Sequence, residues 1–208
     1  MIEPGTLAMF FATSALLALS PGPDNLFVMT VSAQQGRNAG LLVTLGLCTG
    51  LLFHTAAVSC GVAALFAASA MAFNLLKYAG AAYLLYLAWL SLRAGVASGA
   101  TSITERPAHA ALYRRGILMN ITNPKVSIFF LAFLPQFADP SRRYLPLQLI
   151  QLGGVFIIST ILVFGIISVL AGTVGERFRR SAGAQKFFNR AAAGIFTALA
   201  VKLALAQR

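Results

Sequence analysis

The amino-acid sequence predicts an all-α polytopic membrane protein with six transmembrane helices, arranged as two inverted three-helix repeats. The membrane class follows from composition: 58% of the 208 residues are hydrophobic, only 10% are charged, and the mean hydropathy is +0.79. A soluble domain of this size needs more polar surface than this chain can supply. The repeats are predicted by a similarity between the two halves of the chain, and breaks in helices 1 and 4 by proline motifs.

Segments of about 20 apolar residues, the length that crosses a hydrocarbon core of about 30 Å, define the expected spans. Six such segments lie near residues 6–32, 39–67, 71–92, 115–136, 145–173 and 185–206. The connections are short except for residues 94–113, which are rich in Gly, Ala, Ser and Thr. This linker separates a first repeat, residues 1–93, from a second repeat, residues 114–208, within a single transmembrane domain, residues 1–208.

The first span contains the motif SPGPDN at residues 20–25. Proline lacks an amide hydrogen and clashes with the preceding turn, so Pro21 and Pro23 around Gly22 predict two half-helices. Lipid cannot satisfy the freed backbone groups, and the break therefore predicts a cavity. Asp24 and Asn25 begin the second half-helix, where the helix dipole favours a carboxylate. Asp24 either has a functional role, as a costly carboxylate within a span usually does, or only caps a kinked helix near the interface.

Small residues recur along the second span at helical spacing, at Gly46, Gly50, Ala57 and Gly61. Such a stripe allows close packing of membrane helices. His54 is the large polar member of the same stripe. Two interpretations of His54 stay open: a hydrogen-bonded packing residue, or a group that transfers protons.

The third and sixth spans carry similar segments, KYAGAAYLLYLA at residues 77–88 and RAAAGIFTALAV at residues 190–201. In each, a cation precedes small residues, and an aromatic residue, Tyr83 or Phe196, follows six positions after the cation. A duplicated unit with an odd number of spans places its two copies in opposite orientations. This is the inverted-repeat plan of many transporters.

The fourth span contains NITNPK at residues 120–125, and Pro124 predicts a second helix break. Asn120, Asn123 and Lys125 are candidate binding residues beside it. Lys125 lies too deep to reach the membrane surface, so it needs an anionic partner or water. One interpretation is a permanent bridge to Asp24. The other places a zwitterionic amino acid between them, its ammonium near Asp24 and its carboxylate near Lys125.

The net charge of +11 reflects membrane orientation rather than nucleic-acid binding, because the basic residues lie in connections and at span ends without interleaved aromatics. Around the first, third and fifth connections there are nine basic residues, against four on the opposite side. The nine are Arg37, Arg93, Arg106, Arg114, Arg115, Arg177, Arg179, Arg180 and Lys186; the four are Lys77, Arg142, Arg143 and Arg208. The positive-inside rule then predicts that both termini lie outside.

The sequence lacks the motifs of several enzyme and metal-binding classes. It has no G-x-x-x-x-G-K-[ST] phosphate loop, no Cys/His/carboxylate cluster with metal-ligand spacing and no G-x-S-x-G elbow. We therefore expect no ATP hydrolysis, no metal, no cofactor and no enzymatic activity. Two alternatives to transport remain: a thiol-redox membrane protein using Cys48 and Cys60, and a non-transporting subunit that docks a partner. The two cysteines are twelve residues apart on one predicted helix, too far to bond there.

Together, SPGPDN, KYAGAAYLLYLA and NITNPKVSIFFLAFLPQF resemble the LysE/RhtB family of bacterial amino acid exporters over nearly the whole chain. The resemblance implies a multi-pass protein of the bacterial inner membrane that exports amino acids such as homoserine, threonine, leucine or lysine, driven by the proton gradient. It leaves open which amino acid is the cargo and whether copies form a homo-oligomer. The family's two motifs fall on Ser20, Pro21, Gly22, Pro23 and Asp24, and on Asn120, Asn123, Pro124 and Lys125.

Overall fold

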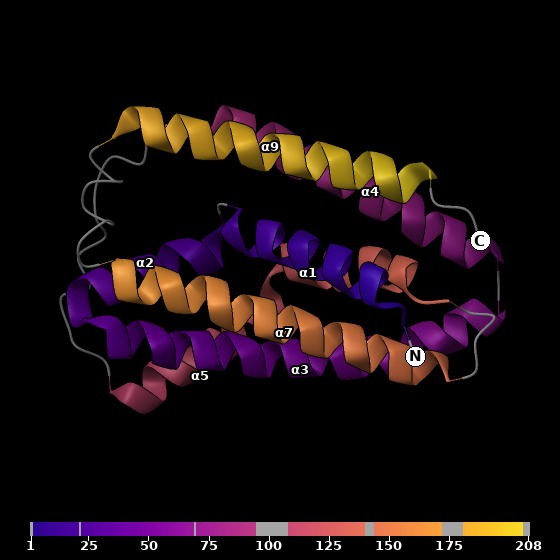
Figure 1. Cartoon of the computed structure of the whole chain (residues 1–208), viewed down its shortest axis with the longest axis horizontal. Coiled ribbons are helices and arrows are strands. Elements are labelled where there is room, and N and C mark those ends of the chain that lie inside the picture. Colours follow the sequence, from indigo (N-terminus) through magenta and orange to yellow (C-terminus); the bar gives the residue numbers. More distant parts are fainter. Residues whose placement is uncertain are drawn as a thin grey trace.

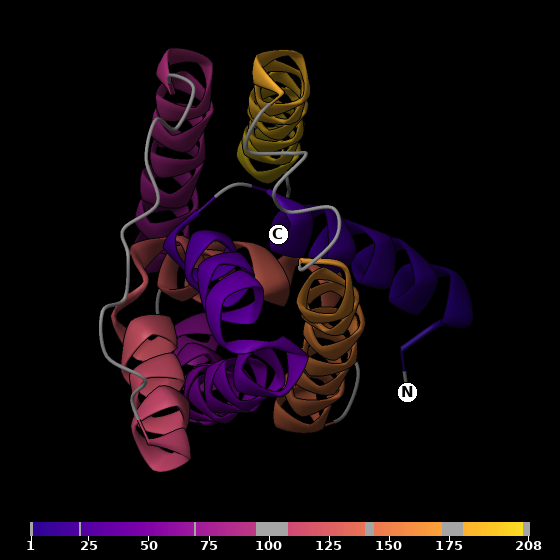
Figure 2. The same cartoon turned by 90° about the vertical axis from the view of Figure 1, so that its left-hand side faces the viewer.

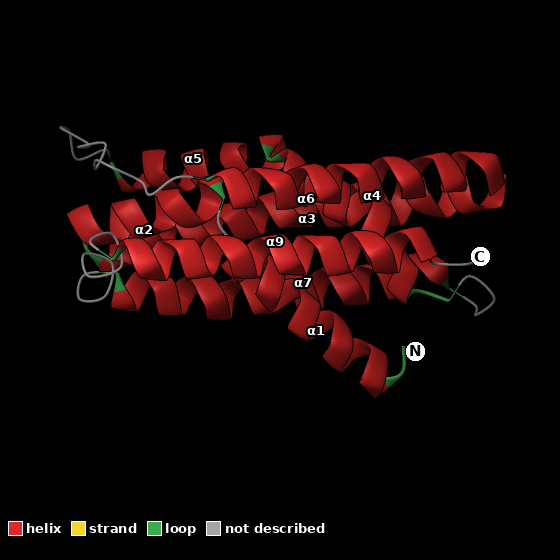
Figure 3. Cartoon of the chain, turned by 90° about the horizontal axis from the view of Figure 1, so that it is seen from above, coloured by secondary structure: helices red, strands yellow, loops and turns green. Residues whose placement is uncertain are grey.

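A computed structural model describes residues 2–20, 22–68, 70–94, 108–139, 144–171 and 181–205, and within these ranges the chain is helical with no strand (Figures 1 and 3). The elements in chain order are α1 (Pro4–Leu19), α2 (Pro23–Gln35), α3 (Arg37–Ala68), α4 (Ala70–Arg93), α5 (His109–Thr122), α6 (Pro124–Ile128), the π-helix η1 (Phe129–Phe133), the 3₁₀-helix η2 (Leu134–Phe137), α7 (Leu145–Leu170) and α9 (Ala182–Leu205).

Four continuous segments are long and apolar enough to cross a membrane: Arg37–Gly61, Asn74–Arg93, Leu145–Leu170 and Ala182–Leu205. Two bent pairs, α1 with α2 and α5 with Pro124–Phe137, bring the number of candidate spans to as many as six if each pair is one span. The predicted all-helical membrane class is confirmed. Of the predicted linker, residues 95–107 lie outside the described residues, and α5 begins at His109.

The first helix break lies between α1 and α2, whose axes differ by 65°. α1 ends at Leu19, and the Ser20 amide closes its last turn on the carbonyls of Leu16 and Leu17. α2 starts at Pro23, a favourable first helical residue because its missing N–H would have no partner there. Gly22 precedes it in extended backbone. Pro21, the other predicted break residue, lies outside the described residues.

The second helix break lies at Asn123, where the chain bends by 51°. The Asn123 side chain accepts a hydrogen bond from the Lys125 amide at 3.0 Å, and Pro124 occupies the first position of α6. Asparagine followed by proline is a strong helix start, which also ends the preceding helix. The predicted break at Pro124 is confirmed.

The helices pack as a bundle in which α3 lies between α5 and α7, α1 packs on α7, and α4 pairs with α9 (Figure 2). Gly46 and Gly116 allow the close approach of α3 and α5, since a Cβ added to Gly116 would lie 2.5 Å from the Val43 carbonyl oxygen. The predicted stripe on α3 is wrong beyond His54: Ala57 is exposed and no atom lies within 4 Å of a Cβ at Gly61. α5 runs beside α3 only until it ends at Thr122, so among the described residues it does not cover Ala57 and Gly61.

Aromatic side chains fill the core beside the second break. η1 buries Phe129, Phe130 and Phe133, and ring contacts connect them to phenylalanines of α1, η2 and α7, with centroids 4.9–6.1 Å apart for most pairs. The start of α1 and the end of α9 lie at the same end of the bundle (Figure 1).

Candidate functional site

Lys125, beside the second helix break, is hydrogen-bonded to the end of α1. Its ammonium nitrogen donates to the Leu17 carbonyl at 3.3 Å and to the carbonyl and hydroxyl oxygens of Ser20, each at 3.2 Å. The C-terminus of a helix carries partial negative charge and unpaired carbonyls, so a buried cation is stabilised there. No ion pair with Asp24 occurs among the described residues, so a permanent bridge to that carboxylate is not what holds Lys125.

Asp24 lies in the first turn of α2 and is 4% exposed. Its Oδ1 has no hydrogen-bond partner, although Lys125, Asn123, Asn120 and His54 surround the carboxyl group. The helix N-terminus favours its negative charge. Gly22, not Asp24, is the N-cap of α2, and no side chain caps that end. The interpretation of Asp24 as a mere cap therefore has no supporting hydrogen bond.

A cavity of about 20 Å³ lies between the two breaks. Its wall combines four polar residues with apolar ones: Leu17, Ala18, Asp24, Leu51, Asn120, Lys125, Val126, Phe156, Thr160 and Phe164. On this measure roughly 10–15 Å³ holds one water molecule, so the cavity has room for about one. Between the half-helices there is therefore a small chamber with four polar residues in its wall, too small to hold an amino acid.

Gly22 keeps space open for the ammonium group of Lys125. A Cβ added at Gly22 would lie 3.1 Å from Nζ and 3.6 Å from Cε of Lys125. The glycine of the first motif thus lies beside the ammonium group of the lysine of the second.

The remaining predicted residues support the chamber without lining it. Asn25 donates through Nδ2 to the Ala18 carbonyl, which ties α2 back to α1 across the break. His54 lies 3.2 Å through Nε2 from the Asn120 carbonyl oxygen, and its ring centroid is 5.5 Å from that of Phe130. Asn123 caps α6 through its side-chain oxygen, while its Nδ2 is buried without a partner.

Thr160 of α7 is the wall residue that sequence reasoning missed. It is 3% exposed and its hydroxyl oxygen has no hydrogen-bond partner. The sequence gives only a weak signal for it, a hydroxyl in the middle of a long apolar span, and the neighbouring Ser159 carries the same signal. Threonine in a membrane helix also ordinarily bonds its own backbone, so its type alone does not indicate a site.

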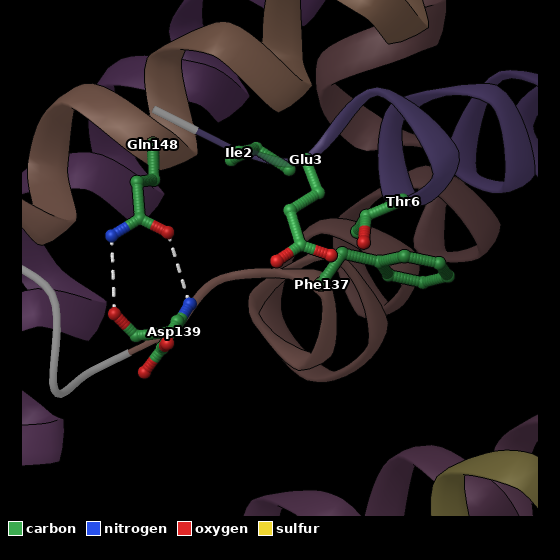
Figure 4. Close-up of a pocket in the computed structure, with 6 residues that line it drawn as sticks. All are labelled: Ile2, Glu3, Thr6, Phe137, Asp139 and Gln148. Carbon is green, nitrogen blue, oxygen red and sulfur yellow. Dashed lines mark hydrogen bonds between the residues drawn. The ribbon is translucent and has the colours of Figure 1, made fainter.

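A second cavity, of about 210 Å³, lies at the end of the bundle where α1 begins (Figure 4). Glu3, Thr6, Phe137, Asp139 and Gln148 are among its wall residues. The Gln148 amide accepts from the Asp139 amide at 3.0 Å and donates to its carbonyl at 3.1 Å. These bonds hold the end of η2 against the start of α7.

Packed rings separate the two cavities. Phe156 lines the chamber, and successive ring contacts of 5.2, 4.9 and 5.2 Å lead through Phe129 and Phe133 to Phe137, which lines the second cavity. A continuous row of aromatic side chains therefore lies between the chamber and the second cavity. Among the described residues, no group of three or more His, Cys, Asp or Glu side chains could hold a metal ion.

These features define a class: a multi-pass helical membrane protein whose interrupted helices enclose a buried polar site, as transporters do. The chain belongs to the LysE type translocator family, whose family model matches residues 15–207. Members of this family are transporters, so the predicted resemblance and the absence of an enzymatic role are both confirmed.

Relatives of known sequence align over nearly the whole chain. The homoserine/homoserine lactone efflux protein of Salmonella typhimurium is 34% identical over 201 residues, covering 95% of each chain. An uncharacterized membrane protein of Vibrio cholerae is 34% identical over 199 residues, covering 95% of this chain and 96% of its own. Another from Pseudomonas aeruginosa is 32% identical over 195 residues, covering 90% and 89%. No solved structure matches the chain.

Proposed function

We propose that the chain exports an amino acid or a close derivative from the cytoplasm across the bacterial inner membrane by proton antiport. The observation that carries the proposal is the Asp24 carboxyl group, which is buried in the chamber with an oxygen that no protein group satisfies. A carboxylate within a membrane span is costly, more so with an unsatisfied oxygen, and is generally kept for function. An ammonium group or a proton supplies the missing partner.

Antiport follows from competition for Asp24. A proton arriving from outside neutralises the carboxylate and releases the cargo ammonium, and loss of that proton to the cytoplasm restores the cation site. The chamber is too small for cargo, so binding requires the half-helices around the breaks to separate. Asn120 offers a second unsatisfied oxygen beside Asp24 for the ammonium. Asn25, His54 and Asn123 position these groups.

The cargo class is suggested by the relative from Salmonella typhimurium, which is named for homoserine and homoserine lactone. Both molecules carry an α-ammonium next to an acyl oxygen, but the lactone has no carboxylate. We therefore assign recognition first to the ammonium. Lys125 acts through its positive charge on the chamber wall, because its N–H donors are bonded to the end of α1.

Two inverted repeats, residues 1–93 and 114–208 joined by the linker 94–113, account for the packing pattern. α5 packs on α3 as α1 packs on α7, and the third helices of the two halves, α4 and α9, pack on each other. Both first helices are bent, by 65° and 51°. The proposed topology has both termini outside; the helix ends that carry Arg37, Arg93 and Arg114 lie opposite the termini (Figure 1).

Purified protein in liposomes with an imposed pH gradient tests this function. The wild type should move homoserine out against its gradient, whereas Asp24→Asn should keep the fold and lose gradient-driven flux. Glu3→Gln, which neutralises a carboxylate of the other cavity, is the matched control and should transport normally. Wild-type flux in Asp24→Asn overturns the coupling role, and a wild type that moves no amino acid favours a docking subunit.

A further inference from the structure

The Thr160 hydroxyl departs from a rule that five other buried hydroxyls of this protein follow. A serine or threonine in a helix normally donates to the carbonyl four residues earlier, which hides its polarity. Ser14, Ser32, Thr44, Thr55 and Ser91 do so, at 2.6–2.9 Å. Thr160 lies in the uninterrupted helix α7, yet its Oγ1 is buried without a partner.

Thr160, whose hydroxyl has no partner, lies in the wall of the chamber. The residue lines the chamber together with Asp24 and Asn120, whose Oδ1 atoms are also buried and unsatisfied. Ser168, farther along α7, has an unpaired hydroxyl as well but does not line the chamber. The unsatisfied polar atoms around the chamber are therefore two acceptor oxygens, from α2 and α5, and one hydroxyl from α7. The fourth polar wall residue, Lys125, already donates its hydrogen bonds to the end of α1.

This combination of unsatisfied atoms matches the chemistry of an α-amino acyl compound. An ammonium donates three hydrogen bonds and suits the two acceptor oxygens, whereas an acyl oxygen only accepts and suits a hydroxyl donor. We propose that Thr160 is a specificity-determining residue of the chamber, which donates its hydroxyl to the acyl oxygen shared by a free amino acid and its lactone. The proposal rests on the proposed function, since it concerns the same site.

Binding of homoserine and of homoserine lactone to the purified protein, measured by calorimetry, tests the assignment. Thr160→Val keeps nearly the same shape but cannot donate, and it should weaken the binding of both compounds by about tenfold or more, the loss expected for a hydrogen bond left unmade in a buried site. Thr160→Ser keeps the donor and should bind as the wild type does. Thr55→Val removes a buried hydroxyl that is bonded to its own helix and should change nothing.

A third compound distinguishes recognition from a general disturbance of the chamber. n-Butylamine has the ammonium group but no acyl oxygen, and it should bind the wild type and Thr160→Val equally. Equal binding of homoserine by both proteins overturns the proposal, as does an equal weakening of all three compounds. Binding that depends on Thr160 in a protein that shows no export in liposomes supports the assignment but overturns the proposed function. A wild type that binds none of the compounds overturns both.

Discussion

Replacing Gly50 by alanine tests how tightly the chamber depends on the contact between α3 and α5. A Cβ at Gly50 would lie 2.7 Å from Cβ and 2.6 Å from Oδ1 of Asn120. Carbon atoms in contact prefer separations of about 3.5–4.0 Å, so the two helices must move apart by roughly 1 Å. The Asn120 Cβ is fixed to its helix and cannot swing away. Binding sites tolerate displacements of about 0.5 Å, and overpacking costs about 1–3 kcal/mol.

We therefore expect Gly50→Ala to lower the free energy of unfolding by about 1–3 kcal/mol and homoserine flux by more than about tenfold. Thermal unfolding in detergent and flux in liposomes measure the two effects. Gly61→Ala on the same helix is the matched control, because no atom lies within 4 Å of a Cβ there. Its stability should change by less than about 1 kcal/mol, in the stabilising direction. Normal stability and flux in Gly50→Ala would refute the packing argument.

Three other variants give further tests. Lys125→Met should lower the unfolding free energy by about 2 kcal/mol, because three hydrogen bonds to the end of α1 are lost and such bonds in membranes contribute about 0.6 kcal/mol each; unchanged thermal unfolding would contradict this. Phe129→Ala should cost about 3–5 kcal/mol, since the ring is 0% exposed, whereas Phe53→Ala, at 59% exposed, should cost under about 1 kcal/mol. Replacing both Cys48 and Cys60, which are free thiols on α3, by alanine should leave flux intact; lost flux with normal folding would favour a thiol-based activity.

The helix breaks could be predicted from the sequence because their causes are local. Proline at residue 124 ends one helix and starts the next whatever surrounds it, and Asn123 supplies the cap within the same tripeptide. The extents of the helices likewise follow from the runs of apolar residues, because a helix must be apolar over the length that crosses the hydrocarbon core. Composition and local backbone chemistry therefore determined both the membrane class and the places where the spans are interrupted.

The partners across the chamber could not be predicted in the same way. Sequence patterns suggested a carboxylate as the partner of Lys125, because charge pairing is the simplest way to bury a cation, but the structure uses the carbonyls of Leu17 and Ser20. Which oxygen is nearest depends on how α1 and α6 cross, and this is set by tertiary packing. Thr160 illustrates the same limit: its missing helix bond is visible only once α7 is placed against the two breaks.

The position of the charges within the proposed repeats explains why one break needs the other. Pro23 and Pro124 each begin a second half-helix, and the residue that follows is Asp24 in the first half and Lys125 in the second. A carboxylate is favoured at a helix N-terminus, but a cation is opposed by its own helix dipole. Lys125 overcomes this because the C-terminus of α1 receives its hydrogen bonds. The second break is thus stabilised by the first, because separating α1 from α6 would break the hydrogen bonds that hold Lys125.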